Sequence, residues 1–301
     1  MCCLFGLLDP QRNLTGARKT RLLHALATAA EARGTDASGI AYNAARKLVI
    51  HKAPVPGRML KFQIPDDATA IMGHTRMTTQ GNEIFNRNNH PFRGNTPTGA
   101  FALAHNGVLY NDKELREKLE LPRTTIQTDS YIAVQLIEQR EALDFSSLKY
   151  MAEQVEGSFT FAVLDAEDNL YIVKGDSPFY MLRFPKRKIS LYASTEEILQ
   201  TAAKLARLLL RDAERVDIDS GEIVKIDRAG EITRGTFDDA RLYQGVWSYS
   251  RQYACCGGES HLSELKDVAA WMGYPPELID YFTARGYVPE EIEEILYEGE
   301  I

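Results

Sequence analysis

Short segments of the chain carry apolar residues in alternation or in unbroken runs, and longer segments repeat them at helical spacing. The first pattern is typical of strands and the second of helices. Strands are predicted near residues 3–8, 38–43, 47–52, 68–75, 101–108, 158–165, 169–174, 189–193 and 222–227, and helices near 17–32, 112–119, 129–140, 146–154 and 195–207. Paired strands followed by blocks of helix predict an α+β fold. A sandwich of two antiparallel sheets covered by helices suits the pattern, as do other α+β arrangements.

The pattern changes after residue 240, where an aromatic stretch and a Cys-Cys-Gly-Gly break precede three short helical patterns. These patterns lie near residues 262–272, 276–284 and 289–297, and prolines punctuate them. The sequence therefore predicts a large domain at 2–240, a linker at 241–258 and a small helical domain at 259–301. In size and pattern the small domain resembles a ubiquitin-associated domain. It either packs against the large domain or docks a partner.

Composition excludes several classes of protein. The 301 residues are 44% hydrophobic, enough for a full core, and 42 acidic against 35 basic residues give a net charge of −7 without a long Lys/Arg cluster. Nucleic-acid binding is therefore disfavoured. No apolar run approaches the roughly 20 residues that span a bilayer, and residues 2–8 lack the basic flank and length of a signal peptide. We expect a cytoplasmic protein with no membrane partner, and an oligomer is compatible with the sequence.

The cysteines form two adjacent pairs, Cys2-Cys3 and Cys255-Cys256. This spacing suits neither a disulfide framework nor a Cys-x-x-Cys zinc site, and it fits a reducing compartment. No metal and no cofactor are expected.

Cys2 is the candidate nucleophile. Removal of Met1 would place a thiol and a free α-amino group on one residue, and the α-amino pKa of about 7.7–8 makes that group a base near neutral pH. The alternative is a buried cysteine at the start of a strand.

Three further places in the sequence have the polar groups that amide hydrolysis needs. Asn106 and Gly107 follow an apolar strand and offer a side-chain amide and a backbone N–H for an oxyanion; the alternative is a hairpin turn. Arg76 follows the apolar stretch 68–72, where its guanidinium can face a carboxylate, or form a surface ion pair. Asp129 precedes a predicted helix, and Thr128-Asp129 fits a helix N-cap.

Taken together, these motifs resemble those of the class II glutamine amidotransferases, the glutaminases with an N-terminal nucleophile. The resemblance covers roughly residues 2–235. The matching segments are Cys2 to Gly6, Arg33 to Gly39, Gly73 to Gly81, Asn89-His90-Pro91, His105-Asn106-Gly107, Thr128-Asp129, Glu156 to Ala162, Gly175-Asp176, Ala193 to Glu196 and Gly221-Glu222. The resemblance implies a four-layer αββα sandwich and a thioester on Cys2.

The resemblance also implies a role for each binding residue. Arg76 takes the α-carboxylate of L-glutamine, Thr79 adds a hydrogen bond nearby, and Asp129 takes the α-ammonium group. Arg33 orients the catalytic end, with an exposed arginine at a helix terminus as the alternative.

Three residues depart from the family pattern. Cys3 stands where glycine is common, Gln80 replaces a frequent histidine, and Met77 replaces an aromatic residue that helps to close the pocket and guide ammonia. The last change weakens any expectation of tight channelling.

We expect a stand-alone glutaminase subunit, because the residues after 240 are too few for a second catalytic domain. A partner synthase would then receive the ammonia. One alternative is an amidase or γ-glutamyl peptide hydrolase with the same nucleophile. Another is a non-catalytic glutamine sensor or scaffold that uses the C-terminal helices.

Overall fold

The computed structural model describes residues 2–242 and, farther along, residues 266, 269, 274–285, 287, 292 and 295. The chain divides into two units, residues 1–244 and 245–301. The Cys255-Cys256 pair and most of the predicted linker lie outside the described residues. The domain limits at 240 and 258 stay predictions.

The first unit alternates strands and helices in the order that the apolar pattern predicts. Its helices are α1 (Gly16–Ala29), α2 (Asp112–Lys118), α3 (Tyr131–Gln139), α4 (Phe145–Gln154) and α5 (Glu196–Ala206), with short 3-10 turns at Ala30–Ala32, Gly57–Met59 and Asn86–Asn88. Its strands are β1 (Cys3–Leu8), β2 (Ala37–Ala44), β3 (Lys47–Ala53), β4 (Ala70–Arg76), β5 (Phe92–Thr96), β6 (Gly99–Leu109), β7 (Gly157–Leu164), β8 (Leu170–Lys174), β9 (Tyr180–Phe184), β10 (Ile189–Ala193), β11 (Glu214–Arg215), β12 (Glu222–Ile226) and β13 (Ile232–Thr236). Each strand and helix predicted within residues 2–242 is present.

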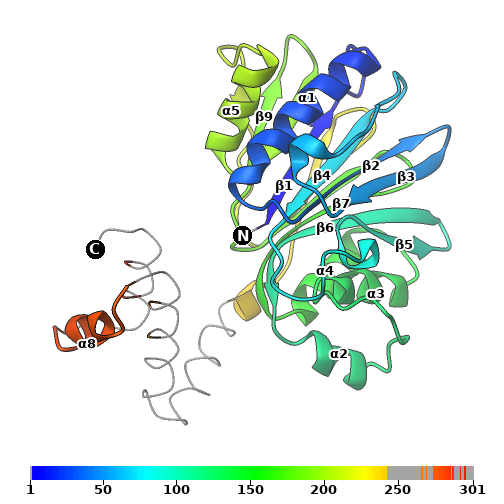
Figure 1. The fold of residues 1–301 in the computed structure, drawn as a ribbon. Coiled ribbons are helices and arrows are strands. Elements are labelled where there is room, and N and C mark those ends of the chain that lie inside the picture. Colours follow the sequence, from blue (N-terminus) through cyan, green and yellow to red (C-terminus); the bar gives the residue numbers. More distant parts are fainter. Residues whose placement is uncertain are drawn as a thin grey trace. The chain divides into compact units, whose positions relative to one another are not determined.

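Two antiparallel sheets form the centre of this unit. The seven-stranded sheet has the order β11-β9-β10-β1-β4-β2-β3, and the six-stranded sheet has the order β13-β12-β8-β7-β6-β5. Figure 1 shows α1 and α5 on the outer face of the first sheet and α3 and α4 on that of the second. The four-layer αββα sandwich is therefore confirmed.

Three apolar clusters correspond to the three contacts between these layers. One joins α1 and α5 to the seven-stranded sheet, another joins α2, α3 and α4 to the six-stranded sheet, and the third consists of strand residues from both sheets. Strand β1 contributes to the first and third clusters, so all of its residues are buried. A strand with both faces covered needs an unbroken apolar run, which is what residues 3–8 provide.

Local signals fix where some helices begin. Thr15 caps α1 and accepts a hydrogen bond from the Arg18 N–H at 3.3 Å. Asp144 and Ser147 form a reciprocal capping box at α4, in which each side chain accepts from the other residue's backbone N–H. Such caps satisfy N–H groups that have no partner within the helix.

Four strands were missed in the sequence. Three of them, β5, β11 and β13, lie at sheet edges, and β9 lies next to the edge strand β11. Edge strands tolerate polar residues and glycine because one side faces no neighbouring strand. In β5 and β13, arginine, glycine and threonine interrupt the apolar pattern.

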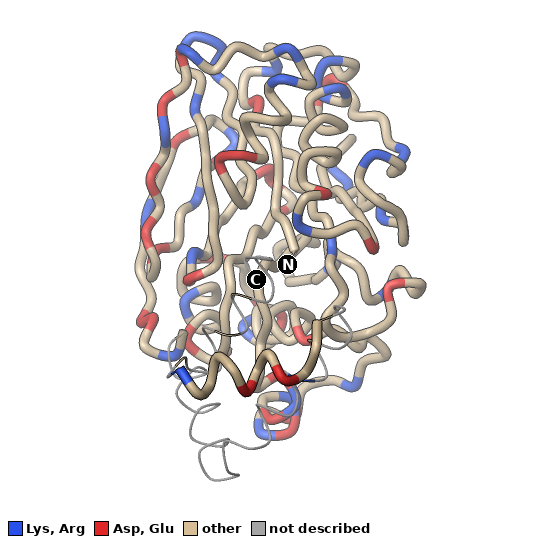
Figure 2. The backbone as a smooth tube through the Cα atoms, turned by 60° about the vertical axis from the view of Figure 1, so that its left-hand side comes forward, with Lys and Arg blue, Asp and Glu red and all other residues tan. Residues whose placement is uncertain are grey.

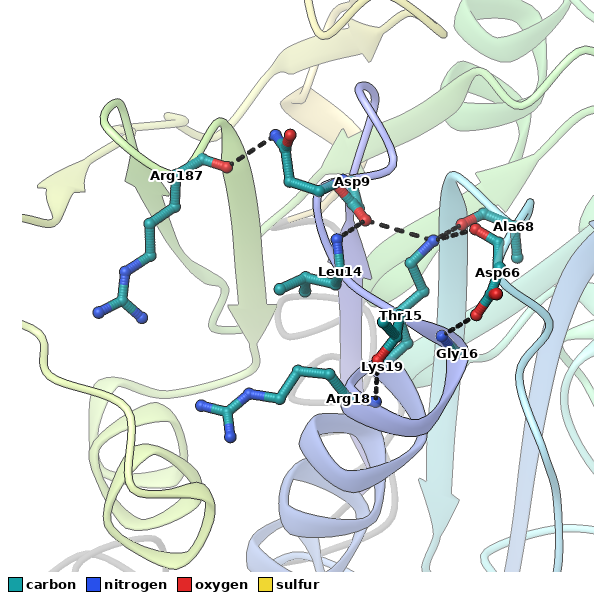
Figure 3. Close-up of polar contacts among 10 residues, drawn as sticks. Asp9, Leu14, Thr15, Gly16, Arg18, Lys19, Asp66, Ala68 and Arg187 are labelled. Atoms are coloured by element: carbon teal, nitrogen blue, oxygen red, sulfur yellow. Dashed lines mark hydrogen bonds and ion pairs between the residues drawn. The ribbon is translucent and has the colours of Figure 1, made fainter.

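The end of β1 farthest from Cys2 carries a buried ion pair, shown in Figure 3. The Lys19 ammonium lies 3.2 Å from the Asp9 carboxylate, and both side chains are fully buried. It also donates hydrogen bonds to the carbonyl oxygens of Asp66 and Ala68 at 2.8 and 2.6 Å. The Asp9 carboxylate accepts in turn from the backbone N–H groups following β1. Every donor of the ammonium therefore has a partner.

Figure 2 shows acidic and basic residues interspersed along most of the described backbone, and Lys186-Arg187-Lys188 is a short run of basic residues alone. None of the described helices combines the length and apolar character needed to cross a bilayer.

The second unit contains α8 (Glu277–Thr283), which confirms the helix predicted near 276–284. Its described apolar residues form a small cluster of Ala269, Ile279, Ile292, Tyr274, Leu278 and Phe282. The other two helices predicted here fall largely outside the described residues.

Candidate active site

Strand pairing gathers the predicted site residues around the start of β1. Cys2 directly precedes this central strand, and its thiol donates to the Met77 carbonyl oxygen at 3.5 Å. The Arg33 guanidinium, half-buried after the 3-10 turn that follows α1, donates to the Cys2 carbonyl oxygen at 2.9 Å. Arg33 therefore fixes the backbone beside the candidate nucleophile and is not an exposed arginine at a helix terminus.

The two neighbouring thiols have different environments. Burial raises the pKa of Cys2, and the positive charge of Arg76 opposes this effect. Cys3 is completely buried, which raises its pKa to about 11. At neutral pH Cys3 remains a protonated thiol without access to solvent, so Cys2 is the nucleophile candidate of the pair.

Asn106 and Gly107 lie inside β6, so the hairpin-turn alternative is wrong. The Asn106 amide donates to the Ser194 hydroxyl oxygen at 3.2 Å, and that oxygen also accepts from the Leu4 N–H at 2.9 Å. Ser194 thus joins the oxyanion candidate to β1. The sequence marked Ser194 as part of a family motif without giving it a role in the site.

Gly107 occupies a position that only glycine fits. Its φ is +139°, and a Cβ there would lie 1.9 Å from the Ser158 carbonyl oxygen. Any side chain would break the pairing of β6 with β7, which holds Asn106 opposite Thr160.

Arg76 is the last residue of β4, where the strand gives way to a loop as predicted. It is only 2% exposed, so the surface ion-pair alternative is wrong. Its guanidinium donates to the Asn89 side-chain oxygen at 2.7 Å, to the Gly81 carbonyl oxygen at 3.0 Å and to the Gln80 carbonyl oxygen. These bonds use three of five N–H donors, which leaves capacity for a carboxylate.

The loop after Arg76 shows what the departures from the family pattern change. Gln80 contacts Arg76 through its backbone carbonyl, so a different side chain at this position preserves the contact. Thr79 is exposed, and Met77 is 51% exposed. The Thr78 backbone N–H donates to the Asp36 carboxylate at 2.7 Å.

Asp129 is buried just ahead of α3. The N-cap of α3 is Ser130 and no side chain caps the helix, so the N-cap interpretation of Thr128-Asp129 is wrong. One Asp129 oxygen accepts from the Leu109 N–H at the end of β6, at 2.7 Å, and the other accepts from the Ser130 hydroxyl at 3.3 Å. The carboxylate is thereby fixed relative to the strand that carries Asn106.

Three buried histidines lie behind these groups. A ring nitrogen of His74 lies 2.9 Å from the His105 carbonyl oxygen, and the His74 and His90 rings are 4.2 Å apart. Burial lowers the pKa of His74 to about 3 and that of His90 well below its usual range, and it also lowers the pKa of His105. With such low pKa values, His74 and His90 are neutral at pH 7 and poor general bases. The two ring nitrogens of His105 lie 2.8 Å from the Ser130 hydroxyl and 3.3 Å from the Ser158 carbonyl oxygen, so both are engaged.

Within the described part of the chain, no group of three or more His, Cys, Asp or Glu side chains is arranged to hold a metal ion.

Residues 74–201 match the family described as "Glutamine amidotransferase domain". The glutamine–fructose-6-phosphate aminotransferase (isomerizing) of Lactococcus lactis is 35% identical over 158 residues, 49% of this chain and 26% of that protein. The amidophosphoribosyltransferase of Methanocaldococcus jannaschii is 29% identical over 248 residues, 79% of this chain and 49% of that protein. The chain thus spans about half, or less, of the length of these relatives.

The solved structure of glutamine phosphoribosylpyrophosphate amidotransferase from B. subtilis shares the fold. It superimposes with a TM-score of 0.60 at 20% identity, over 79% of this chain and 49% of that chain. At this identity the likeness supports the sandwich architecture alone.

Proposed function

We propose that this chain, whose residues 74–201 match a glutamine amidotransferase domain, hydrolyses L-glutamine to glutamate and ammonia through a γ-glutamyl thioester on Cys2. The observation that carries the proposal is geometric: the Cys2 thiol donates to the carbonyl oxygen of Met77, directly after Arg76, and the Asp129 carboxylate is bound to the end of the strand that carries Asn106. An amino acid has one charge of each sign, and Arg76 and Asp129 complement them.

Activation of Cys2 needs a base, because burial raises its pKa. The pKa values of His74 and His90 are too low for this task, and both ring nitrogens of His105 are engaged, which favours the α-amino group that removal of Met1 would expose. In this mechanism the amine accepts the thiol proton as sulfur attacks the amide carbon. The proton then passes to the departing nitrogen, so ammonia leaves and the thioester remains.

The Asn106 amide and the Gly107 N–H stabilise the negative oxygen of the tetrahedral intermediate. Water then attacks the thioester carbon and transfers its proton to the amine. The collapse of the second intermediate returns the thiol to Cys2 and releases glutamate.

Arg76 binds the α-carboxylate and Asp129 the α-ammonium group of the substrate, and Thr79 adds a hydrogen bond nearby. Arg33 orients the Cys2 backbone. A free amino-acid end satisfies both charged residues, which favours L-glutamine over a simple amide. A γ-glutamyl peptide carries the same two charged groups, so side-by-side assays of L-glutamine and γ-glutamyl peptides separate these two substrates.

The described strands and helices of the first unit all belong to the glutaminase sandwich. We therefore assign the use of ammonia to an acceptor outside residues 2–242, supplied by a partner synthase. The protein would then act as a separate glutaminase subunit.

One experiment tests the proposal directly. The protein, expressed without an N-terminal tag, is incubated with 6-diazo-5-oxo-L-norleucine, an electrophilic glutamine analogue, and its N-terminal peptide is analysed by mass spectrometry. Loss of Met1 and a single adduct on Cys2 are expected. Retention of Met1 without an adduct would overturn the mechanism and favour a sensor or scaffold.

A further inference from the structure

Residues 88–91, here called the anchor segment, connect the two charged residues proposed to bind the amino-acid end of glutamine. The Asn89 side-chain oxygen accepts from the Arg76 guanidinium at 2.7 Å. The Asn88 carbonyl oxygen accepts from the Thr128 hydroxyl at 2.8 Å, one residue before Asp129. The position of the segment therefore sets the separation between Arg76 and Asp129.

Asn88 strengthens this connection through its side chain. Its amide donates to the Gln127 side-chain oxygen at 2.9 Å, and its side-chain oxygen accepts from the Gln127 N–H at 3.0 Å. The strand-ending loop with Arg76 and the chain leading to Asp129 are therefore joined through two consecutive asparagines. Both asparagines are completely buried.

One lysine holds the anchor segment on the sheet. The Lys52 ammonium, on β3, donates to the carbonyl oxygens of Asn89 and Pro91 at 2.6 and 3.0 Å. It also lies 5.2 Å from the centre of the Phe92 ring. Each of these two carbonyl oxygens needs a hydrogen-bond donor. A single ammonium group has three donors and supplies both.

The backbone of the segment packs directly on β2 beside this lysine. Gly39 pairs with Lys52 across β2 and β3. A Cβ at position 39 would lie 2.2 Å from the His90 carbonyl oxygen and 2.9 Å from the Pro91 ring. Gly39 thus permits the close approach, and Lys52 supplies the hydrogen bonds that hold it.

We propose that Lys52 is a positioning residue for glutamine binding, which acts through the anchor segment on Arg76 and Asp129. The inference rests on the proposed function, because it assigns these two residues to the α-carboxylate and α-ammonium groups. Lys52 touches neither the substrate nor the reacting atoms.

The test compares Lys52→Met and Lys52→Arg with Lys47→Met, which changes an exposed lysine on the same strand. Lys52→Met keeps the length of the side chain and removes its donors. We expect it to raise KM for L-glutamine about 10- to 100-fold, the effect of losing hydrogen bonds from a charged group, with kcat within about threefold of wild type. Lys52→Arg should recover most of the affinity, and Lys47→Met should match wild type.

Two further measurements separate this inference from the proposed function and from a structural role. Calorimetric titration of L-glutamine into Cys2→Ala protein, with and without Lys52→Met, reports binding without turnover, and the same loss of affinity is expected. Alkylation of Cys2 by iodoacetamide, which uses neither charged residue, should proceed at the wild-type rate in Lys52→Met.

The outcomes then differ clearly. Equal affinity with and without Lys52→Met overturns the inference while leaving hydrolysis by the wild type intact. A lower kcat together with slower alkylation of Cys2 also overturns it, because the lysine would then support the whole site. Failure of the wild type to release ammonia, while binding still depends on Lys52, would contradict the proposed function alone.

Discussion

Both ends of β1 are buried, but the polar groups around them differ in whether they have hydrogen-bond partners. At the far end, the Lys19 ammonium has all three of its partners, and the Asp9 carboxylate accepts from backbone N–H groups. At the end with Cys2, the buried hydroxyl of Thr78 and both ring nitrogens of His90 have no hydrogen-bond partner among the described residues, whereas at the far end the Thr69 hydroxyl is the atom without one. Buried polar groups without partners lower stability. The far end is therefore arranged for stability, and the Cys2 end retains polar groups that a ligand or water can satisfy.

The largest difference between the ends concerns Cys2 itself. We expect Cys2→Ala to lower turnover of L-glutamine by about 10,000-fold or more, since no other group replaces the nucleophile. The thermal midpoint should stay within about 2 °C of wild type, because the change removes one atom at a partly exposed position. Ammonia release and thermal unfolding measure the two effects. Cys3→Ala is the control and should keep its activity; retained activity in Cys2→Ala would sink the mechanism.

At the far end of β1 we expect the opposite result, a loss of stability without a loss of turnover. Lys19→Met leaves the Asp9 carboxylate buried without its partner, so the free energy of unfolding should fall by about 3–5 kcal/mol. The kcat of the folded protein should not change. Urea unfolding followed by fluorescence measures the loss, and Arg21→Met, at an exposed position of the same helix, is the control. Equal stability of the two variants would remove the contrast between the ends.

Asn106→Ala tests the oxyanion assignment. Loss of one such donor should lower kcat about 100- to 1,000-fold and leave KM for L-glutamine nearly unchanged, because the bond forms in the transition state. Steady-state assays of ammonia release separate the two constants. A rise in KM at constant kcat would instead place Asn106 in substrate binding.

Ser194→Ala should have a smaller effect on the same step. The hydroxyl holds the Asn106 amide in place without touching the substrate, so kcat should fall about tenfold, the scale of one hydrogen bond. Ser190→Ala, on the same strand β10, provides the comparison. If both serine variants match wild type, Asn106 keeps its position without Ser194.

The smallest expected effect is the pH dependence of KM for L-glutamine. Burial, followed by the charge of Arg76, lowers the pKa of Lys52 to about 8, and His90 is the other titratable group that interacts with it. Burial keeps His90 neutral, so it does not change charge near pH 8. The Lys52 ammonium, with all its donors, is present below this pKa and is lost as pH rises through about 8. KM for L-glutamine should therefore rise several-fold more between pH 7 and 9 in wild type than in Lys52→Arg, whose charge persists. Parallel pH profiles of the two proteins would contradict this assignment.

Much of the fold was predictable from the sequence because strands covered on both faces leave unbroken apolar runs, as in residues 3–8 and 161–164. The class II glutamine amidotransferase resemblance, drawn from the motifs, is confirmed. Polar edge strands such as β13 were not predicted, because their residues are also common in loops. The roles proposed for Cys2, Arg76 and Asp129 remain predictions.

Side chains that act through another residue left weaker signals. Asn89 stood within a recognised motif, and its bond to Arg76 gives that motif a physical reason. Lys52 had no signal, because a lysine on an edge strand is ordinarily a solvated charge. Its function depends on a loop that returns to the sheet almost forty residues later, which no local pattern records.

The central place of β1 also bears on the order of events during synthesis. One neighbour of β1, β4, ends at residue 76, whereas the other, β10, begins only at residue 189. Strand β1 therefore lacks one of its two neighbouring strands while most of the domain is still being synthesised, at about 5–20 residues per second. That interval of roughly 6–23 seconds is when the start of the chain is least enclosed and the proposed removal of Met1 is easiest. In the proposed mechanism, removal of Met1 and completion of the sheet are then successive steps, and the number of residues between the two strands that pair with β1 sets the time between them.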